Sequence, residues 1–203
     1  MEEAMERPER KSSVLIAAAS ERTAIQIHKT LPMQFGQVAV LSSMSAVKQK
    51  LQQEAFDILI IYTPLPDEPG VQSALELQGR YPGMGIMLLV GAEAYDETQY
   101  RAGDSGIFIM ARPMTTQGFL QSLNLLDAMR KRILRLLEET EKLHRKLEDE
   151  KYISRAKCLL IEKEGMREQE AHRYLEKQAM DAAVTKREVA IRVIRESGRI
   201  ITT

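Results

Sequence analysis

The most restrictive feature of this sequence is a run of large apolar residues, Ile58 to Ile61, that follows Asp57. A strand that is apolar at consecutive positions must be covered on both faces, which is typical of the centre of a parallel sheet. Parallel strands need long crossover connections, which are usually helices. The run therefore predicts an α/β fold in which short strands alternate with helices.

The sequence around this run supplies the expected alternation. Four further strands are predicted by short apolar runs, at residues 14–16, 38–41, 86–90 and 107–110. Helical patterns separate them, at residues 21–31, 43–54, 71–80 and 94–101. Five strands alternating with helices predict a five-stranded doubly wound parallel sheet. Ligand sites in such sheets lie at the carboxyl ends of the strands.

A long helix is predicted after the sheet, because residues 119–150 contain neither Gly nor Pro. Its apolar residues recur at alternating spacings of three and four, which is a heptad pattern. Charged residues surround this seam, so a parallel coiled coil in a homodimer is favoured over the alternative, a purely intramolecular core. The predicted dimer seam consists of Leu126, Met129, Ile133, Leu136, Thr140, Leu143 and Leu147.

Three short amphipathic helices are predicted in the last fifty residues. Gly165 ends the first, since glycine readily adopts the positive φ found after helices. The second is expected to bury Tyr174 and Ala182 along with its other apolar residues, and Cys158 on the first is expected to be a buried, inert thiol. Thr185 and Glu188 form a capping box at the start of the third. A module this small favours a binding function over an enzyme.

Charge and composition limit the functions further. The net charge is +0, but residues 1–125 carry 10 basic against 14 acidic residues (−4), and residues 126–203 carry 19 against 15 (+4). A mildly basic C-terminal half permits nucleic-acid binding. One cysteine excludes an internal disulfide, and with the scattered histidines it predicts no metal site and no cofactor. A single cysteine suits a reducing cytoplasm, so a cytoplasmic location is expected. No apolar run is long enough for a membrane helix, and the polar residues 1–12 are predicted to be a disordered tail.

The C-terminal module resembles a known family. Ala156-Lys157, Gly165-Met166, Glu170-Ala171, Leu175, Ala179-Met180 and Val189-Ala190 are spaced as in the ANTAR domain, the RNA-binding module of transcription antitermination regulators. Four residues depart from the family pattern. Cys158 stands where Gly is usual, Arg167 where a capping Ser is common, Glu176 where a basic residue is frequent and Lys186 where an apolar one is frequent.

The resemblance implies that basic side chains of the three helices contact RNA phosphates. Solvated basic faces are common in proteins, so each of these residues alone is more often ordinary surface. The candidate RNA-binding residues are Arg155, Lys157, Lys163, Arg173, Lys177, Lys186 and Arg187.

Residues 14–129 resemble the receiver domain of bacterial response regulators, from the order of the segments and from Arg112-Pro113 after the last strand. The resemblance implies that the family's phosphorylation pocket falls at Ala18, Ala19, Tyr62, Gly91 and Arg112. Alanines cannot hold Mg²⁺ and tyrosine cannot form an acyl-phosphate, so this domain is interpreted as a pseudo-receiver. The degenerate pocket is either additional core or a relocated regulatory ligand site.

Together these patterns predict a receiver-like α/β domain at 13–125, a coiled-coil linker helix at 126–150 and an ANTAR-like three-helix domain at 151–203. By resemblance, the chain is interpreted as a two-component response regulator that acts as a dimeric, phosphorylation-independent transcription antiterminator. It would bind a pair of leader-RNA hairpins under the control of a partner protein or ligand. The alternative, kept open by Glu176 and Lys186, is a protein-interaction adaptor that does not bind RNA.

Overall fold

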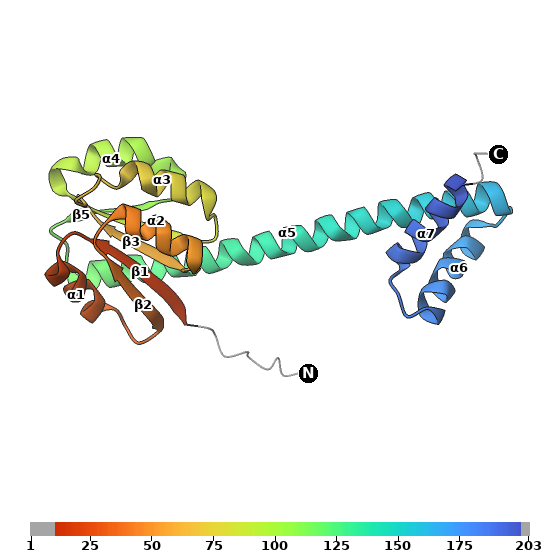
Figure 1. Ribbon diagram of the computed structural model, residues 1–203, viewed down its shortest axis with the longest axis horizontal. Coiled ribbons are helices and arrows are strands. Elements are labelled where there is room, and N and C mark those ends of the chain that lie inside the picture. The colour runs from red at the N-terminus through yellow and green to blue at the C-terminus, as the bar shows by residue number, and fades with distance from the viewer. Residues whose placement is uncertain (1–10, 200–203) are drawn as a thin grey trace. The chain divides into compact units, whose positions relative to one another are not determined.

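The N-terminal unit contains the predicted parallel sheet. The computed structural model describes residues 11–199, so residues 1–10 of the expected tail lie outside the described residues (Figure 1). The strand order is β2-β1-β3-β4-β5, and all neighbouring strands are parallel. The five strands are β1 (Ser12–Ala18), β2 (Phe35–Leu41), β3 (Ile58–Tyr62), β4 (Gly85–Gly91) and β5 (Phe108–Arg112).

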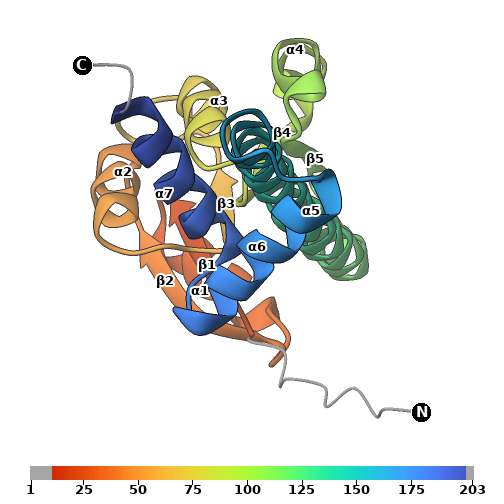
Figure 2. The same ribbon diagram turned by 90° about the vertical axis from the view of Figure 1, so that its right-hand side faces the viewer.

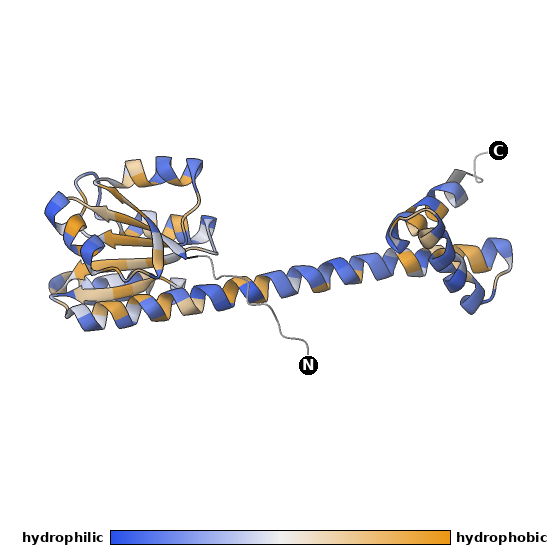
Figure 3. Ribbon diagram, turned by 90° about the horizontal axis from the view of Figure 1, so that it is seen from below, coloured by the Kyte–Doolittle hydropathy of each residue, from blue (hydrophilic) through white to orange (hydrophobic). Residues whose placement is uncertain are grey.

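The apolar run that predicted a central strand does form one. Ile58 to Ile61 belong to β3, which pairs with β1 on one side and with β4 on the other. All four residues are 0% exposed, because helices cover both faces of the sheet. Figure 3 shows the strands as the most hydrophobic part of this unit. The doubly wound α/β fold is therefore confirmed.

Five helices form the two layers around the sheet. One face is covered by α1 (Glu21–Thr30) and the beginning of α5 (Thr116–Glu164), which contribute residues such as Ile27 and Leu123 to one apolar core. The other face is covered by α2 (Met44–Gln53), α3 (Val71–Arg80) and α4 (Tyr95–Ala102). Two short 3-10 turns flank α4, at Ala92–Ala94 and Gly103–Ser105.

Helix α5 is a single helix of 49 residues. The Thr115 hydroxyl accepts a hydrogen bond from the Gly118 N–H at 3.0 Å and so caps its first turn. Gly165 follows its last residue at a φ of +66°, as expected for a helix end. The two compact units divide within this helix, between Leu134 and Arg135. Despite its length, neither α5 nor any other helix within residues 11–199 has the apolar stretch needed to cross a membrane.

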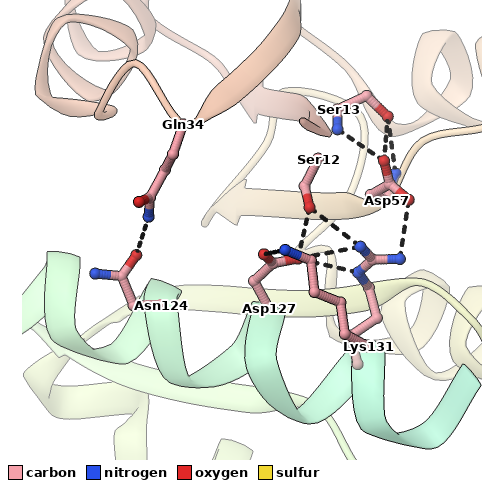
Figure 4. A network of polar contacts seen from close by, with 8 residues as sticks. Ser12, Ser13, Gln34, Asp57, Asn124, Asp127 and Lys131 are labelled. Atoms are coloured by element: carbon pink, nitrogen blue, oxygen red, sulfur yellow. Dashed lines mark hydrogen bonds and ion pairs between the residues drawn. The ribbon is translucent and has the colours of Figure 1, made fainter. Parts of the chain in front are cut away.

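A buried polar network holds α5 against the start of the sheet (Figure 4). Arg130 forms ion pairs with Asp57 at 2.9 Å and with Asp127 at 3.1 Å. Asp127 also accepts a hydrogen bond from the Ser12 hydroxyl at 2.7 Å. Burial alone would raise the pKa of the Asp127 carboxyl. Hydrogen bonds from Ser12, Lys131 and Arg130 lower this pKa by more than burial raises it, so it lies below its ordinary value. The network therefore joins both carboxylates to one guanidinium.

The C-terminal unit consists of the end of α5 together with α6 (Glu168–Asp181) and α7 (Lys186–Arg199) (Figure 2). The predicted capping box at the start of α7 is confirmed. The Thr185 N–H donates to the Glu188 carboxylate at 2.8 Å, and the Glu188 N–H donates to the Thr185 hydroxyl at 3.2 Å. The small apolar core comprises Ala156, Leu160, Ala171, Leu175, Ala179, Val189, Ala190 and Val193.

Three residues expected in this core are exposed. The Tyr174 side chain is 38% exposed and Ala182 is also exposed, because α6 buries only the stripe Ala171, Leu175 and Ala179. Cys158 is exposed as well. It is two residues from both Ala156 and Leu160, a displacement of about 200° around a helix, which places it on the side of α5 away from the core.

Candidate functional site

Every position of the degenerate pocket lies at a carboxyl end of the sheet. Ala18, Tyr62 and Gly91 are the last residues of β1, β3 and β4. Ala19 follows directly after β1, and Arg112 is the last residue of β5. None of these residues except Arg112 bears a charge, so the strand ends provide no carboxylate for a divalent cation.

Arg112 is held in place by neutral partners. Its guanidinium stacks on the ring of Tyr62, with 3.9 Å between Cζ and the ring centroid. Its Nη2 donates to the Thr63 carbonyl oxygen at 2.6 Å. Its Nε is buried and has no hydrogen-bond partner within residues 11–199. In the described part of the chain, this cation forms no ion pair with a carboxylate.

Asp57 and Asp67, the aspartates nearest to Tyr62 in the sequence, are bonded to other parts of the fold. Asp57 is bonded to Arg130 and to the Ser13 N–H at the opposite end of the sheet. Asp67 accepts hydrogen bonds from the N–H groups of Met44 and Ser45 at the start of α2. These bonds, with Ser45 contributing most, lower the pKa of the Asp67 carboxyl to about 2. Neither carboxylate therefore replaces the missing acceptor at Tyr62.

Four of the seven candidate RNA-binding residues contact other groups within the three-helix module. Lys157 is paired with Glu168 at 3.4 Å, and Lys163 donates to the Ser197 carbonyl oxygen at 2.6 Å. Arg187 pairs with Asp149 at 3.4 Å and lies over the ring of Tyr152. Lys186 pairs with Glu176 at 2.8 Å. These contacts join α5, α6 and α7, and they partly occupy the donors that RNA would need.

The residues that depart from the ANTAR pattern at 176 and 186 are partners of each other. The Lys186 ammonium lies 2.8 Å from the Glu176 carboxylate, and His172 lies 3.3 Å from the same carboxylate. The hydrogen bond from Lys186, followed by its charge, lowers the pKa of Glu176. The two residues that differ from the ANTAR pattern, Glu176 and Lys186, therefore neutralise each other's charge in one ion pair between α6 and α7. This pairing could not be read from the sequence, because it depends on how the two helices pack.

The other three candidates, Arg155, Arg173 and Lys177, are exposed. The structure records no hydrogen bond or ion pair for them among residues 11–199. Arg173 and Lys177 are each two residues from the buried stripe of α6, so they lie on its outer face, four residues apart. Met180, 81% exposed, continues that face. Arg173 also borders a shallow hollow of about 400 Å³ with Lys157 and His172, so the structure brings these two candidate cations together.

The heptad seam on α5 is exposed except at its start. Leu126 is 7% exposed and belongs to the core of the N-terminal unit, so it is not free for a partner helix. Its assignment to the seam is corrected for this reason. The remaining apolar positions, Met129, Ile133, Leu136, Leu143 and Leu147, are between 47% and 63% exposed. They form an unpartnered apolar stripe in the midst of charged residues.

Within residues 11–199, no group of three His, Cys, Asp or Glu side chains is arranged to hold a metal ion. Two hollows of the three-helix module are shallow and lined mainly by charged side chains such as Glu168 and Arg173.

Comparison with known proteins identifies a known domain in the C-terminal part of the chain. The model of the ANTAR domain matches residues 141–194. Two curated relatives, both named transcriptional regulatory protein PdtaR, come from Mycobacterium tuberculosis strains CDC 1551 / Oshkosh and ATCC 25618 / H37Rv. Each is 27% identical over 143 residues, which is 70% of this chain and 69% of the relative.

Solved structures resemble the N-terminal unit. A signal receiver domain of an HD domain-containing protein from Pseudomonas fluorescens Pf-5 has a TM-score of 0.57 and 19% identity, covering 62% of this chain and 93% of that one. A CheY-like receiver domain from Methanospirillum hungatei JF-1 has a TM-score of 0.55 and 16% identity, covering 61% and 98%. At these identities the likeness shows the receiver fold alone.

Proposed function

We propose that this chain, an ANTAR-domain response regulator with an N-terminal receiver fold, binds a structured leader RNA and prevents the formation of a terminator hairpin. The observation that carries the proposal is the match of residues 141–194 to the ANTAR domain. A three-helix module with shallow, charged hollows is consistent with this function, since it presents its charged side chains at the surface.

The RNA contact is proposed to centre on the outer face of α6. Arg173 and Lys177 are exposed there and are not committed to ion pairs in the described chain. Free cations can neutralise phosphates without first losing an existing partner, whereas Lys186 would have to leave Glu176. Tyr174, which is 38% exposed, lies beside this face and could stack on an unpaired base.

Control of this activity is proposed not to involve phosphorylation of the receiver-like unit. Tyr62 lies at the carboxyl end of the central strand, and Ala18 and Ala19 lie at the end of β1. Without carboxylates at these positions, neither Mg²⁺ binding nor acyl-phosphate formation is available. The signal would instead come from a partner protein or a ligand.

The active form is proposed to be a parallel homodimer through the exposed stripe on α5. Residues such as Leu143 and Leu147 are exposed at heptad spacing along one helix, and exposed apolar surface that is contiguous often marks an interaction site. A second copy of the same stripe would cover it at heptad spacing. Two ANTAR modules on one dimer would favour RNAs with two hairpins over RNAs with one, through effective concentration.

A gel-shift titration with a two-hairpin leader RNA at two salt concentrations tests the proposal. The full-length protein is compared with the double variant Arg173→Ala, Lys177→Ala. Each lost phosphate contact should lower the slope of log affinity against log salt by about 0.7–0.9. A matched control, Arg22→Ala with Lys29→Ala, removes the same charge from α1 of the receiver-like unit and should leave binding unchanged.

Tight, salt-dependent binding of the two-hairpin RNA that the double variant loses would support the proposal, as would weak binding of a single hairpin. A purified dimer that does not bind the two-hairpin RNA would contradict the proposal. That result would favour the alternative of a protein-interaction adaptor, for which the intramolecular pairing of Lys157, Lys186 and Arg187 is the supporting observation.

A further inference from the structure

A cavity of about 270 Å³ lies in the N-terminal unit, beside the carboxyl ends of β3 and β5. Helix α1 and the first turns of α5 form its walls. Its volume is just below the range of about 300–1,000 Å³ that is typical for small-molecule pockets. Thr23, Gln26 and Thr30 line it from α1, and Met114, Thr116 and Phe119 line it at the start of α5.

The cavity contains one charged group, and that group lacks a counter-charge. Of the ten residues that line the cavity, only Arg112 is of a charged type (Asp, Glu, Lys or Arg). Arg112 is half-buried, and in residues 11–199 its recorded partners are the Thr63 carbonyl and the Tyr62 ring. Its Nε is buried with its hydrogen-bonding capacity unused. A cation withdrawn from water without an anionic partner is costly, so a bound anion would stabilise this arrangement.

The other polar groups around the cavity are also suited to an anion. The hydroxyl groups of Thr23, Thr116 and Tyr62 can donate hydrogen bonds. Thr116 is the first residue of α5, so the positive end of that helix borders the cavity. The partial positive charge of this helix end would add to the attraction for an anion. The assignment rests on the volume of this partly open pocket and on Arg112, which has no anionic partner among the described residues.

The remaining wall decides what kind of anion fits. Ile27 and Phe119 are buried apolar residues of the adjoining core, and Met114 packs against the same core. An inorganic anion such as phosphate would face these side chains without a hydrogen-bond partner, which is unfavourable. A small organic carboxylate can place its charged group on Arg112 and its carbon atoms against this wall.

We propose that this partly open cavity is a binding site for a small organic carboxylate, held by Arg112 and bordered by α1 and the start of α5. Arg112 forms the ion pair, Tyr62 positions the guanidinium by stacking, and the apolar wall selects for a hydrocarbon body. The site does not depend on the ANTAR module, and it can be tested without RNA.

Ligand-observed NMR on the full-length protein provides the test, with butyrate, benzoate and inorganic phosphate as probes. Butyrate or benzoate should bind, and phosphate should bind more weakly or not at all. Arg112→Gln should weaken carboxylate binding about tenfold or more, because it removes the only cation in the cavity. The control Arg101→Gln changes an exposed arginine on α4 in the same unit and should have no effect.

A second variant keeps the test decisive if Arg112→Gln does not fold. Gln26 is exposed on α1 at the edge of the cavity, so Gln26→Trp should fill the cavity and abolish binding while Arg112 is unchanged. Wild-type protein that binds neither carboxylate would overturn the proposal. Binding that persists in Gln26→Trp would also overturn it, and phosphate binding as tight as that of benzoate would overturn the assignment to organic carboxylates.

Discussion

Arg130 connects three segments that are far apart in the sequence. It is 7% exposed and bonds Asp57 before β3, Asp127 on α5 and Ser12 at the start of β1. The sequence did not predict this network, because its members are separated by up to 118 residues and no local pattern links them. By contrast, the box of Thr185 and Glu188 was predicted correctly, since both partners lie within one turn of helix.

Replacing Arg130 with Ala should destabilise the N-terminal unit by about 3 kcal/mol or more, because two partly buried carboxylates lose their shared cation. Urea unfolding followed by circular dichroism measures this loss. Arg132→Ala, at an exposed neighbouring position, should change stability by no more than about 0.5 kcal/mol. A loss in Arg130→Ala as small as that of the control would show that the network contributes little.

Asp67 should make the stability of the protein depend on acid. Its carboxyl has a pKa of about 2 in the folded chain against an ordinary value of 3.8. A lowered pKa stabilises the folded state above the ordinary value, and this contribution disappears as the pH falls through the folded value. Wild type should therefore be more stable than Asp67→Asn at pH 6, and the difference should shrink between about pH 4 and pH 2. Thermal unfolding of both proteins across this range measures it, and a constant difference would contradict the assignment.

At the level of single helices, the sequence predicted where the helices of the C-terminal module lie. It did not predict correctly all of the residues that they bury. Spacings of three and four residues place both Tyr174 and Leu175 on the predicted apolar face of α6. Of these two residues, only Leu175 is buried in the core. Cys158 was misassigned for a related reason, since its apolar neighbours Leu159 and Leu160 lie at other angles on α5. Which part of a broad apolar face is covered depends on the neighbouring helices, and sequence periodicity does not contain that information.

The stripe on α5 leads to a prediction about assembly. Leu143→Lys should dissociate the proposed dimer, because it places a charge within an apolar heptad seam. Analytical ultracentrifugation measures the change in mass. His144→Lys introduces the same side chain one residue away, outside the seam, and should leave the dimer intact. A dimer that survives Leu143→Lys would mean that association uses another surface.

For the molecule as a whole, the sequence predicted the α/β fold and the family resemblance of the C-terminal module, because both rest on regular spacing. It placed domain limits at 125/126 and 150/151, and both positions fall inside the continuous helix α5. The single exposed thiol provides a test at this scale. Cys158 follows Leu147 by 11 residues, or about three helical turns, so it lies on the same side of α5.

A parallel dimer in register should therefore bring the two copies of Cys158 close together. Mild oxidation should give a disulfide-linked dimer on non-reducing gels, with Cys158→Ser as the control that cannot cross-link. Efficient cross-linking supports the parallel arrangement. A dimer in ultracentrifugation that never cross-links would indicate antiparallel helices or a shifted register.

Helix α5 also restricts how such a protein can be recombined. It contributes Phe119 and Leu126 to one core and Ala156 and Leu160 to the other, while residues 136–148 belong to neither. A chimera with a different N-terminal unit keeps both cores whole only if its junction lies in that middle segment. If the seam pairs two copies, the exchange must also preserve the heptad phase. Functional chimeras, natural or designed, should therefore differ in the length of this helix by multiples of about seven residues.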